Sequence, residues 1–281
     1  MEKLLIAGGD MRQLYCGRRL SGKFEVSVTG FDVDMLPDGI AEENDGKCRY
    51  AVLPVPPLDE SGNVNTPCFS GSMTVSDVKR RLAPDAVIFA GRVNDELRLL
   101  FDGYEVLDYM EREELSLRNA VPTAEGAVQI ALEEMPVTLS GTKVLIVGMG
   151  RIGTALAEIL KGFGADITAA VRNAKGAAKA ALLGVKSVCT KEMPHGYGLV
   201  FNTVPSMIFG RDELSRFGKD TLFIDLASKP GGIDLASAQE LGMKVVWALG
   251  LPGKTAPVTA GEIIAETIKN MISERGDDHV R

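Results

Sequence analysis

Short apolar runs recur along the first half of the chain, separated by segments whose apolar residues repeat at helical spacing. The first run, residues 3–7, ends at Gly8-Gly9-Asp10, as a buried parallel strand does where it enters a turn. Further strand-like runs lie at residues 24–28, 50–55, 86–90 and 104–107, with a helix-like patch at 76–82. This alternation of strand and helix predicts a mainly parallel sheet, and we expect a flavodoxin-like N-terminal lobe.

The pattern becomes more regular in the second half of the chain. Strand-like runs fall at residues 143–147, 167–171, 185–188, 199–204, 222–226 and 244–248, with helical segments between most of them. Six strands in this order match a complete Rossmann sheet. A last helix, residues 259–272, has no strand after it, so we expect it to pack back on the first lobe.

The stretch at residues 111–135 is rich in helix formers and is interrupted only by Pro122, which predicts the end of one helix. Thr123 would open the next helix and place its hydroxyl, with the carboxylate of Glu125, where two domains meet. An ordinary pair of surface helices fits the propensities equally well. We interpret the stretch as a connection and expect three parts: a substrate lobe at 1–120 completed by a C-terminal helix at 257–275, an inter-lobe helix at 121–139, and a Rossmann domain at 140–256.

A glycine-rich loop stands where a Rossmann domain binds a dinucleotide. Gly148-Met149-Gly150-Arg151-Ile152-Gly153 follows a strand-like run directly and opens a helical segment that stops at Gly164. Gly148 permits the tight turn, Gly150 lets the backbone approach a pyrophosphate, and Gly153 lets the helix pack closely on the strand. The amides of Arg151 and Ile152 at the helix start then face the negative charge.

The end of the second strand indicates which dinucleotide is bound. An NAD site usually places Asp or Glu about 20 residues beyond the loop, whereas this chain has Arg172 and Asn173 there, followed by Lys175. A carboxylate would repel a 2′-phosphate and a guanidinium attracts it, so the sequence favours NADP over NAD. A solvated surface arginine is the alternative interpretation of Arg172.

Polar and small residues also gather at the carboxyl ends of later strands, where open α/β sheets bind their ligands. Turn chemistry explains the Gly and Pro content of these segments, but less well their amide and hydroxyl groups. The expected contacts of the dinucleotide are Asn202, Thr203, Val204, Pro205, Ala227 and Ser228.

Composition narrows the classes of function that fit. A chain of 281 residues is longer than a single hydrophobic core usually organises, so we expect two domains. A net charge of −7 without a basic run argues against nucleic acid as a partner. No segment has the length and apolarity of a membrane span, and the four cysteines form no C-x-x-C pair, so we expect a reduced, cytosolic protein. The two histidines, His195 and His279, follow no predicted strand, and no cluster has metal-ligand spacing.

Five segments together resemble the A subunits of dipicolinate synthase from endospore-forming bacteria. They are the Gly8-Gly9-Asp10-x-Arg12 start and the motifs NAVPTAEG at 119–126, NTVPSMI at 202–208, DLASKPGG at 225–232 and GLPGKTAP at 250–257. The resemblance implies oxidation of dihydrodipicolinate to pyridine-2,6-dicarboxylate with NADP, in the mother-cell cytosol during sporulation. It also implies that the flavoprotein-like B subunit of dipicolinate synthase is the partner.

Such a substrate is a dianion, so its binding site needs cationic side chains and backbone amides as fixed donors. We expect Gly9, Asp10, Arg12, Arg92, Ser228, Lys229 and Lys254 to bind it. The expected catalytic groups are Arg12, Thr123, Glu125 and Lys254, and a homo-oligomer is expected. Two alternatives stay open: an NADP-dependent dehydrogenase of another small carboxylate, and a non-catalytic NADP-binding regulatory subunit.

Overall fold

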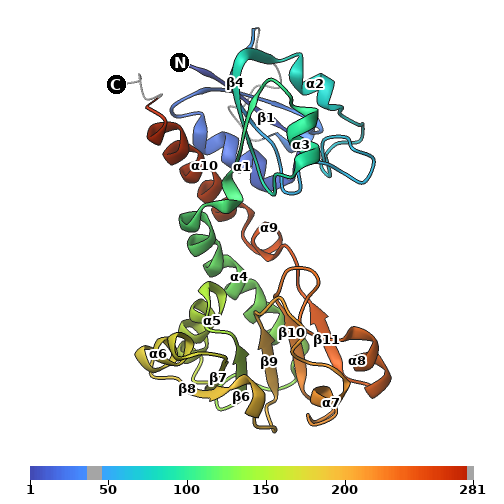
Figure 1. The fold of residues 1–281 in the computed structure, drawn as a ribbon, viewed down its shortest axis with the longest axis vertical. Coiled ribbons are helices and arrows are strands. Elements are labelled where there is room, and N and C mark those ends of the chain that lie inside the picture. The colour runs from blue at the N-terminus through green and yellow to red at the C-terminus, as the bar shows by residue number, and fades with distance from the viewer. Residues whose placement is uncertain (37–45, 277–281) are drawn as a thin grey trace. The chain divides into compact units, whose positions relative to one another are not determined.

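The computed structural model describes residues 1–36 and 46–276, which form two compact units, each with its own parallel sheet (Figure 1). Unit 1 comprises Met1–Asn119 and Ala256–Arg281, and unit 2 comprises Ala120–Thr255. His279 lies outside the described residues.

The sheet of unit 1 has the strand order β2-β1-β3-β4-β5, which is the flavodoxin-like order expected from the sequence. Its strands are β1 (Lys3–Ala7), β2 (Glu25–Thr29), β3 (Cys48–Val52), β4 (Leu82–Ala90) and β5 (Glu105–Asp108), all paired in parallel. Its helices include α1 (Met11–Leu20), α2 (Val75–Lys79), α3 (Asp95–Leu100) and α10 (Pro257–Glu274).

The final helix α10 completes the core of unit 1, as expected. It lies beside α1 on the sheet face that β1 lines with Leu4 and Ile6, whereas α2 and α3 cover the other face (Figure 1). A Cβ atom on Gly261 of α10 would lie 2.5 Å from the carbonyl oxygen of Arg12 and 2.7 Å from Cβ of Tyr15. Glycine therefore allows the two helices to approach this closely.

The sheet of unit 2 has the order β11-β10-β9-β6-β7-β8, which is the complete Rossmann order. Its strands are β6 (Lys143–Val147), β7 (Asp166–Val171), β8 (Lys186–Cys189), β9 (Leu199–Asn202), β10 (Leu222–Asp225) and β11 (Lys244–Trp247). Its helices are α5 (Arg151–Gly162), α6 (Ala174–Leu182), α7 (Arg211–Leu214), α8 (Leu235–Leu241) and α9 (Leu251–Thr255). Residues of the long helix α4 (Glu113–Glu134), of α5 and of α6 pack on one face of the sheet, and those of α7 and α8 pack on the other.

The predicted break at Pro122 is wrong. One continuous helix, α4 (Glu113–Glu134), runs through the proline, so Thr123 and Glu125 lie in a helix interior and not at a helix start. Proline in a helix removes one backbone hydrogen bond. Here the small residues Ala124 and Ala127, both fully buried, pack the following turns against the unit 2 core. This packing outweighs the local preference to break.

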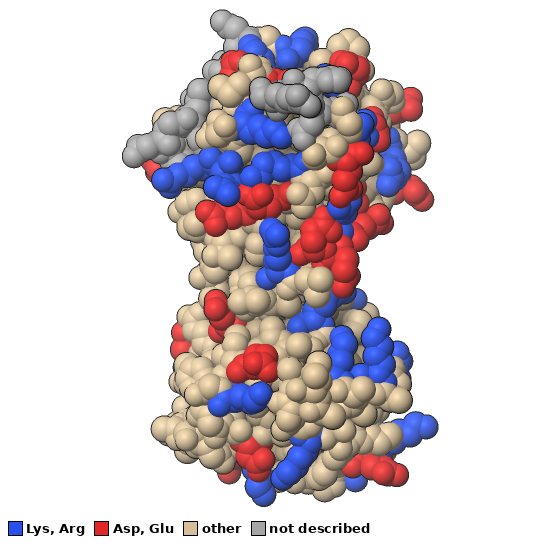
Figure 2. All heavy atoms as spheres, turned by 90° about the vertical axis from the view of Figure 1, so that its left-hand side faces the viewer, with Lys and Arg blue, Asp and Glu red and all other residues tan. Residues whose placement is uncertain are grey.

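Charged side chains are mixed on the face shown in Figure 2, where Lys and Arg lie among Asp and Glu with uncharged surface between them. On this face an anionic ligand would therefore depend on local groups more than on a broad field. Among the helices within residues 1–36 and 46–276, none combines the length and apolarity needed to cross a membrane.

Candidate functional site

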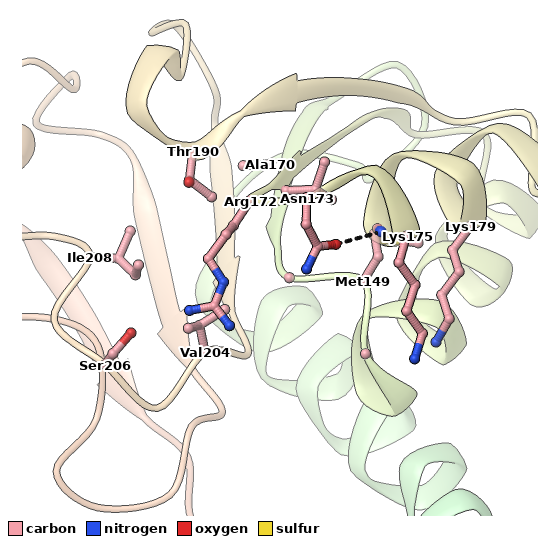
Figure 3. Close-up of a pocket in the computed structure, with 14 residues that line it drawn as sticks. Met149, Ala170, Arg172, Asn173, Lys175, Lys179, Thr190, Val204, Ser206 and Ile208 are labelled. Carbon is pink, nitrogen blue, oxygen red and sulfur yellow. Dashed lines mark hydrogen bonds between the residues drawn. The ribbon is translucent and has the colours of Figure 1, made fainter.

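A cavity of about 300 Å³ opens at the carboxyl ends of β6 and β7 in unit 2 (Figure 3). This is the edge of an open α/β sheet at which ligands bind. Its walls come from the loop after β6, the start of α6 and the segments that follow β8 and β9. They are formed by Gly148, Met149, Gly150, Ala170, Val171, Arg172, Asn173, Lys175, Gly176, Lys179, Thr190, Val204, Ser206 and Ile208.

The glycine loop has the geometry that the sequence pattern predicts. Gly148 has φ +95°, a left-handed conformation that favours glycine. A Cβ atom on Gly153 would lie 2.0 Å from the carbonyl oxygen of Gly148, so only glycine lets α5 start this close to the strand. Gly150 faces open space and leaves its backbone accessible. Arg151 and Ile152 form the first turn of α5 but do not line the cavity.

Three cationic side chains, Arg172, Lys175 and Lys179, form what we call the cationic wall of the cavity. Arg172 points toward Val204, whereas Lys175 and Lys179 extend in parallel from α6 on the other side of Met149 (Figure 3). The side chain of Asn173 accepts a hydrogen bond of 2.9 Å from the Gly176 amide and so caps α6. None of the residues that line this cavity in the described part of the chain is acidic.

Several wall residues escaped the sequence analysis. Lys179 lies one helical turn beyond Lys175, and this spacing would have predicted it once the helix was assigned. Thr190 carries no comparable signal, because it comes from a segment without a motif. Ser206 and Ile208 lie in the NTVPSMI motif at 202–208, but the motif does not show which of its side chains face the cavity.

The residues after β9 include three that line the cavity, Val204, Ser206 and Ile208, and one, Thr203, that contacts the end of β6. Val204 lines the cavity, and the exposed Pro205 follows it. The hydroxyl of Thr203 donates to the carbonyl oxygen of Val147 at 2.8 Å, so it ties this segment to the strand that enters the glycine loop. Thr203 thus supports the loop geometry directly.

Asn202 does not line the cavity, although the sequence predicts it as a contact of the dinucleotide. Its side chain is fully buried and donates from Nδ2 to Asp225 Oδ1 at 2.7 Å, so in this structure it cannot touch a ligand in the cavity. Ala227 is also buried, whereas Ser228 is exposed beyond the end of β10. None of the three lines the cavity. The Asn202 side chain and the Ala227 amide both donate to Asp225, and Ser228 faces solvent.

In unit 1, Asp10 and Arg12 form a bidentate ion pair at the end of β1. Arg12 Nε donates to Oδ1 at 2.9 Å, and Arg12 Nη2 donates to Oδ2 at 2.8 Å. Asp10 also caps α1 by accepting the Arg12 amide at 2.9 Å. Burial raises the pKa of Asp10, but the hydrogen bonds and charge of Arg12 outweigh it and hold the pKa below its ordinary value of 3.8.

This pair fixes the direction of the guanidinium. Because Asp10 occupies the edge formed by Nε and Nη2, a second carboxylate would bind Arg12 through Nη1 and the second N–H group of Nη2. Gly9, which precedes the pair, has φ +105°, and its amide donates to the Asn65 carbonyl oxygen at 2.8 Å. Asp10 therefore orients Arg12, and its own charge would repel an anionic ligand.

Arg92 is the non-glycine residue with positive φ, 62°, in the described part of the chain. Its amide donates to Asp108 Oδ1 at 3.2 Å and that of Val93 donates to Oδ2 at 2.8 Å. A carboxylate at the end of β5 thus holds a strained backbone conformation at the end of β4. The Arg92 side chain itself is exposed.

The remaining predicted residues lie apart from the cavity. Lys229 is exposed in the loop after β10, and Lys254 lines a second cavity of unit 2, about 260 Å³, with Gln129 and Trp247 among its walls. Thr123 is half-buried and Glu125 exposed, both within α4. Neither lines a cavity with Lys254 or with the glycine loop.

Histidine and metal chemistry find no support at the described strand ends. His195 is exposed and packs edge-on against Phe217, with ring centroids 5.7 Å apart. It precedes β9 and so lies toward the sheet edge opposite the cavity. Across residues 1–36 and 46–276, no three His, Cys, Asp or Glu residues are grouped to hold a metal ion.

Two different family models match the two halves of the chain. Residues 3–110 match the family model for the N-terminal domain of the dipicolinate synthase A subunit. Residues 116–229 match the D-isomer specific 2-hydroxyacid dehydrogenase, NAD binding domain. The second match contains the whole glycine loop and the cationic wall, and supports a nicotinamide dinucleotide as the ligand of the cavity.

Relatives cover the chain from end to end. The dipicolinate synthase A subunit of Bacillus subtilis (strain 168) is 31% identical over 97% of this chain and 96% of its own length. Its crystal structure superposes with a TM-score of 0.87 at 30% identity over 99% of this chain and 98% of that one. The corresponding protein from Bacillus halodurans gives 0.85 at 28% over 97% and 98%. A transhydrogenase from Sinorhizobium meliloti, at 16% identity over 98% and 94% with a TM-score of 0.74, shares the fold alone. The chain therefore belongs to the family of dipicolinate synthase A subunits.

Proposed function

We propose that this protein oxidises dihydrodipicolinate to pyridine-2,6-dicarboxylate, with NADP as the hydride acceptor. The observation that carries the proposal is the cavity of unit 2, in which a dinucleotide loop adjoins Arg172, Lys175 and Lys179 without a lining carboxylate. Membership of the family of dipicolinate synthase A subunits supports the substrate.

The cavity residues suit NADP better than NAD. A 2′-phosphate carries a charge of about −1.5 to −2 at neutral pH and binds arginine and lysine through charge-assisted hydrogen bonds. Arg172 and Lys175 lie at the end of β7 and the start of α6, where the adenosine ribose of a Rossmann ligand is bound. When bound, the cofactor accepts a hydride; the chain supplies its position.

The substrate chemistry needs little from the protein beyond positioning. Forming the pyridine removes a hydride to the nicotinamide and one ring proton to a base or water, and the aromatic product provides driving force. A dedicated histidine is then less necessary than for an alcohol. We propose that Arg12, oriented by Asp10, binds one carboxylate. Further candidate donors are Gly9 and Arg92 of unit 1 and Ser228, Lys229 and Lys254 of unit 2.

The cellular setting follows from the same family. We propose that the protein works in the mother-cell cytosol during sporulation, together with the flavoprotein-like B subunit of dipicolinate synthase, and that it forms a homo-oligomer. The roles of Thr123 and Glu125 in catalysis are part of this proposal.

The reaction is tested by absorbance at 340 nm after mixing the protein, NADP and dihydrodipicolinate, with and without the B subunit. Growth of absorbance together with formation of pyridine-2,6-dicarboxylate supports the proposal. Turnover of another small carboxylate alone would identify a different dehydrogenase. Tight NADP binding without turnover of any substrate, even when the B subunit is present, would indicate a regulatory role.

A further inference from the structure

Asp225, the last residue of β10, is a buried carboxylate for which the proposed chemistry has no use. Its side chain is 1% exposed and accepts three hydrogen bonds. The donors are Asn202 Nδ2 at 2.7 Å, the Ala227 amide at 3.0 Å and the Gly232 amide at 2.8 Å. A buried carboxylate without donors costs several kcal/mol, so these groups are held to it firmly.

One of the donors leads to the wall of the dinucleotide cavity through the loop after β9. Asn202 donates from Nδ2 to the Val204 carbonyl oxygen at 3.1 Å and accepts the Val204 amide on Oδ1 at 3.2 Å. Val204 lines the cavity. The Asp225 carboxylate therefore fixes the side-chain amide of Asn202, and this amide fixes Val204.

A second donor leads to the same wall through the loop after β10. The carbonyl oxygen of Gly232 accepts the amides of Ile208 and Phe209, both at 2.9 Å, and Ile208 lines the cavity. A Cβ atom on Gly232 would lie 2.3 Å from Asn202 Nδ2, so the two loops meet where only glycine fits. Asp225 thus reaches both Val204 and Ile208 through one intermediate residue each.

We propose that Asp225 is a positioning residue of the dinucleotide site, which fixes the wall of the cavity formed by Val204 and Ile208. The inference rests on the proposed use of this cavity for the dinucleotide. Asp225 itself does not touch the cavity, and its two oxygens are already engaged by the three donors. Its effect on the ligand is therefore indirect.

The first test replaces the acceptor by an amide of the same shape, Asp225→Asn. The new NH2 group must face at least one of the three donors, which breaks that hydrogen bond and loosens the loops. We expect NADP and NAD affinities to fall together by about tenfold, the scale of a lost charge-assisted bond, with the ratio of the two unchanged because Arg172 is untouched. Calorimetry at a temperature where circular dichroism shows a folded protein measures both.

Asp234→Asn is the matched control. Asp234 lies in the same connection after β10, but its carboxylate accepts the amide and hydroxyl of Ser237, which does not line the cavity, and caps α8. Its backbone amide donates to the Phe209 carbonyl oxygen at 3.0 Å, a bond that the substitution leaves in place. It should bind both dinucleotides like the parent protein. Equal affinities in the parent and in folded Asp225→Asn, or an equal loss in Asp234→Asn, would overturn the inference. Failure of the parent protein to bind either dinucleotide would instead overturn the proposed cofactor.

A second variant covers the case in which Asp225→Asn does not fold. Asn202→Asp places a carboxyl group against Asp225, and two carboxyls at this distance share a proton at low pH and repel one another when both ionise. The ligand in this test is NAD, because the 2′-phosphate of NADP itself gains charge around neutral pH. NAD affinity of the variant should fall as the pH rises, and by more than that of the parent protein. An identical pH profile for the two folded proteins would refute the positioning role.

Discussion

Replacement of Arg172 gives the sharpest test of the cofactor preference. The side chain is exposed, so water screens it, and we take the lower end of the range for a charge-assisted hydrogen bond, about 1.5 kcal/mol or roughly tenfold in affinity. Arg172→Ala should therefore lower NADP affinity about tenfold and leave NAD affinity within about twofold. In Arg172→Asp, repulsion between a carboxylate and the 2′-phosphate adds on the order of 2 kcal/mol, which brings the loss to at least about a hundredfold.

Calorimetric titration of both dinucleotides against each variant measures these changes. Lys186→Ala is the control, because it removes a positive charge from the start of β8, at the opposite end of the strand from the cavity. The NADP advantage of the parent protein should also shrink as salt rises, since the contact is screened. An NADP to NAD ratio that is the same in the parent protein and in Arg172→Ala would refute the role of Arg172.

Three further predictions follow from the two units. Arg12→Ala should lower kcat/KM for dihydrodipicolinate by roughly a hundredfold while NADP affinity changes by less than about threefold; unchanged turnover would remove Arg12 from the site. Because the pKa of Asp10 is lowered in the folded protein, its contribution to stability should be present above pH 4 and lost as the pH falls through the folded pKa. Thermal melts should therefore show Asp10→Asn less stable than the parent protein at pH 6, with a smaller gap near pH 3; a constant gap would contradict this. Thr203→Val should weaken dinucleotide binding about fivefold by releasing the glycine loop, whereas Thr221→Val, which loses a similar 2.8 Å bond to the Tyr197 carbonyl oxygen, should not; equal effects would exclude the loop mechanism.

Much of the fold could be predicted from the sequence, because strands buried on both faces appear as unbroken apolar runs. Residues 3–7 and 143–147 have the same bounds as β1 and β6. Strand ends that merge into turns differ from the prediction by one to several residues. The prediction begins β4 at residue 86, because residues 83–85 of this strand are half-buried or exposed and do not continue the apolar run. The prediction at Pro122 is wrong because it rests on a local preference of proline to end helices, whereas packing against residues distant in the sequence keeps the helix continuous.

The site was predictable only where a contiguous motif carries it. The glycine loop and Arg172 follow from spacing along one strand, loop and helix. The place of Asn202 does not, because the sequence gives no sign of whether a polar side chain at a strand end turns toward a ligand or toward a buried partner such as Asp225. Thr190 and Ile208 enter the cavity only through the tertiary fold.

The position of α10 has a consequence for biosynthesis. Residues 1–119 of unit 1 precede unit 2 in the chain, yet Ile264, Ile268 and Ile272 of α10, which follows unit 2, fill the core of unit 1. Unit 1 therefore lacks part of its interior until α10 has left the ribosome. Unit 2 ends at Thr255 and is complete earlier, which reverses the usual order in which the N-terminal domain folds first. The apolar face of α1 is then without its α10 partner during synthesis, the period in which the nascent protein is most exposed to aggregation and to chaperones.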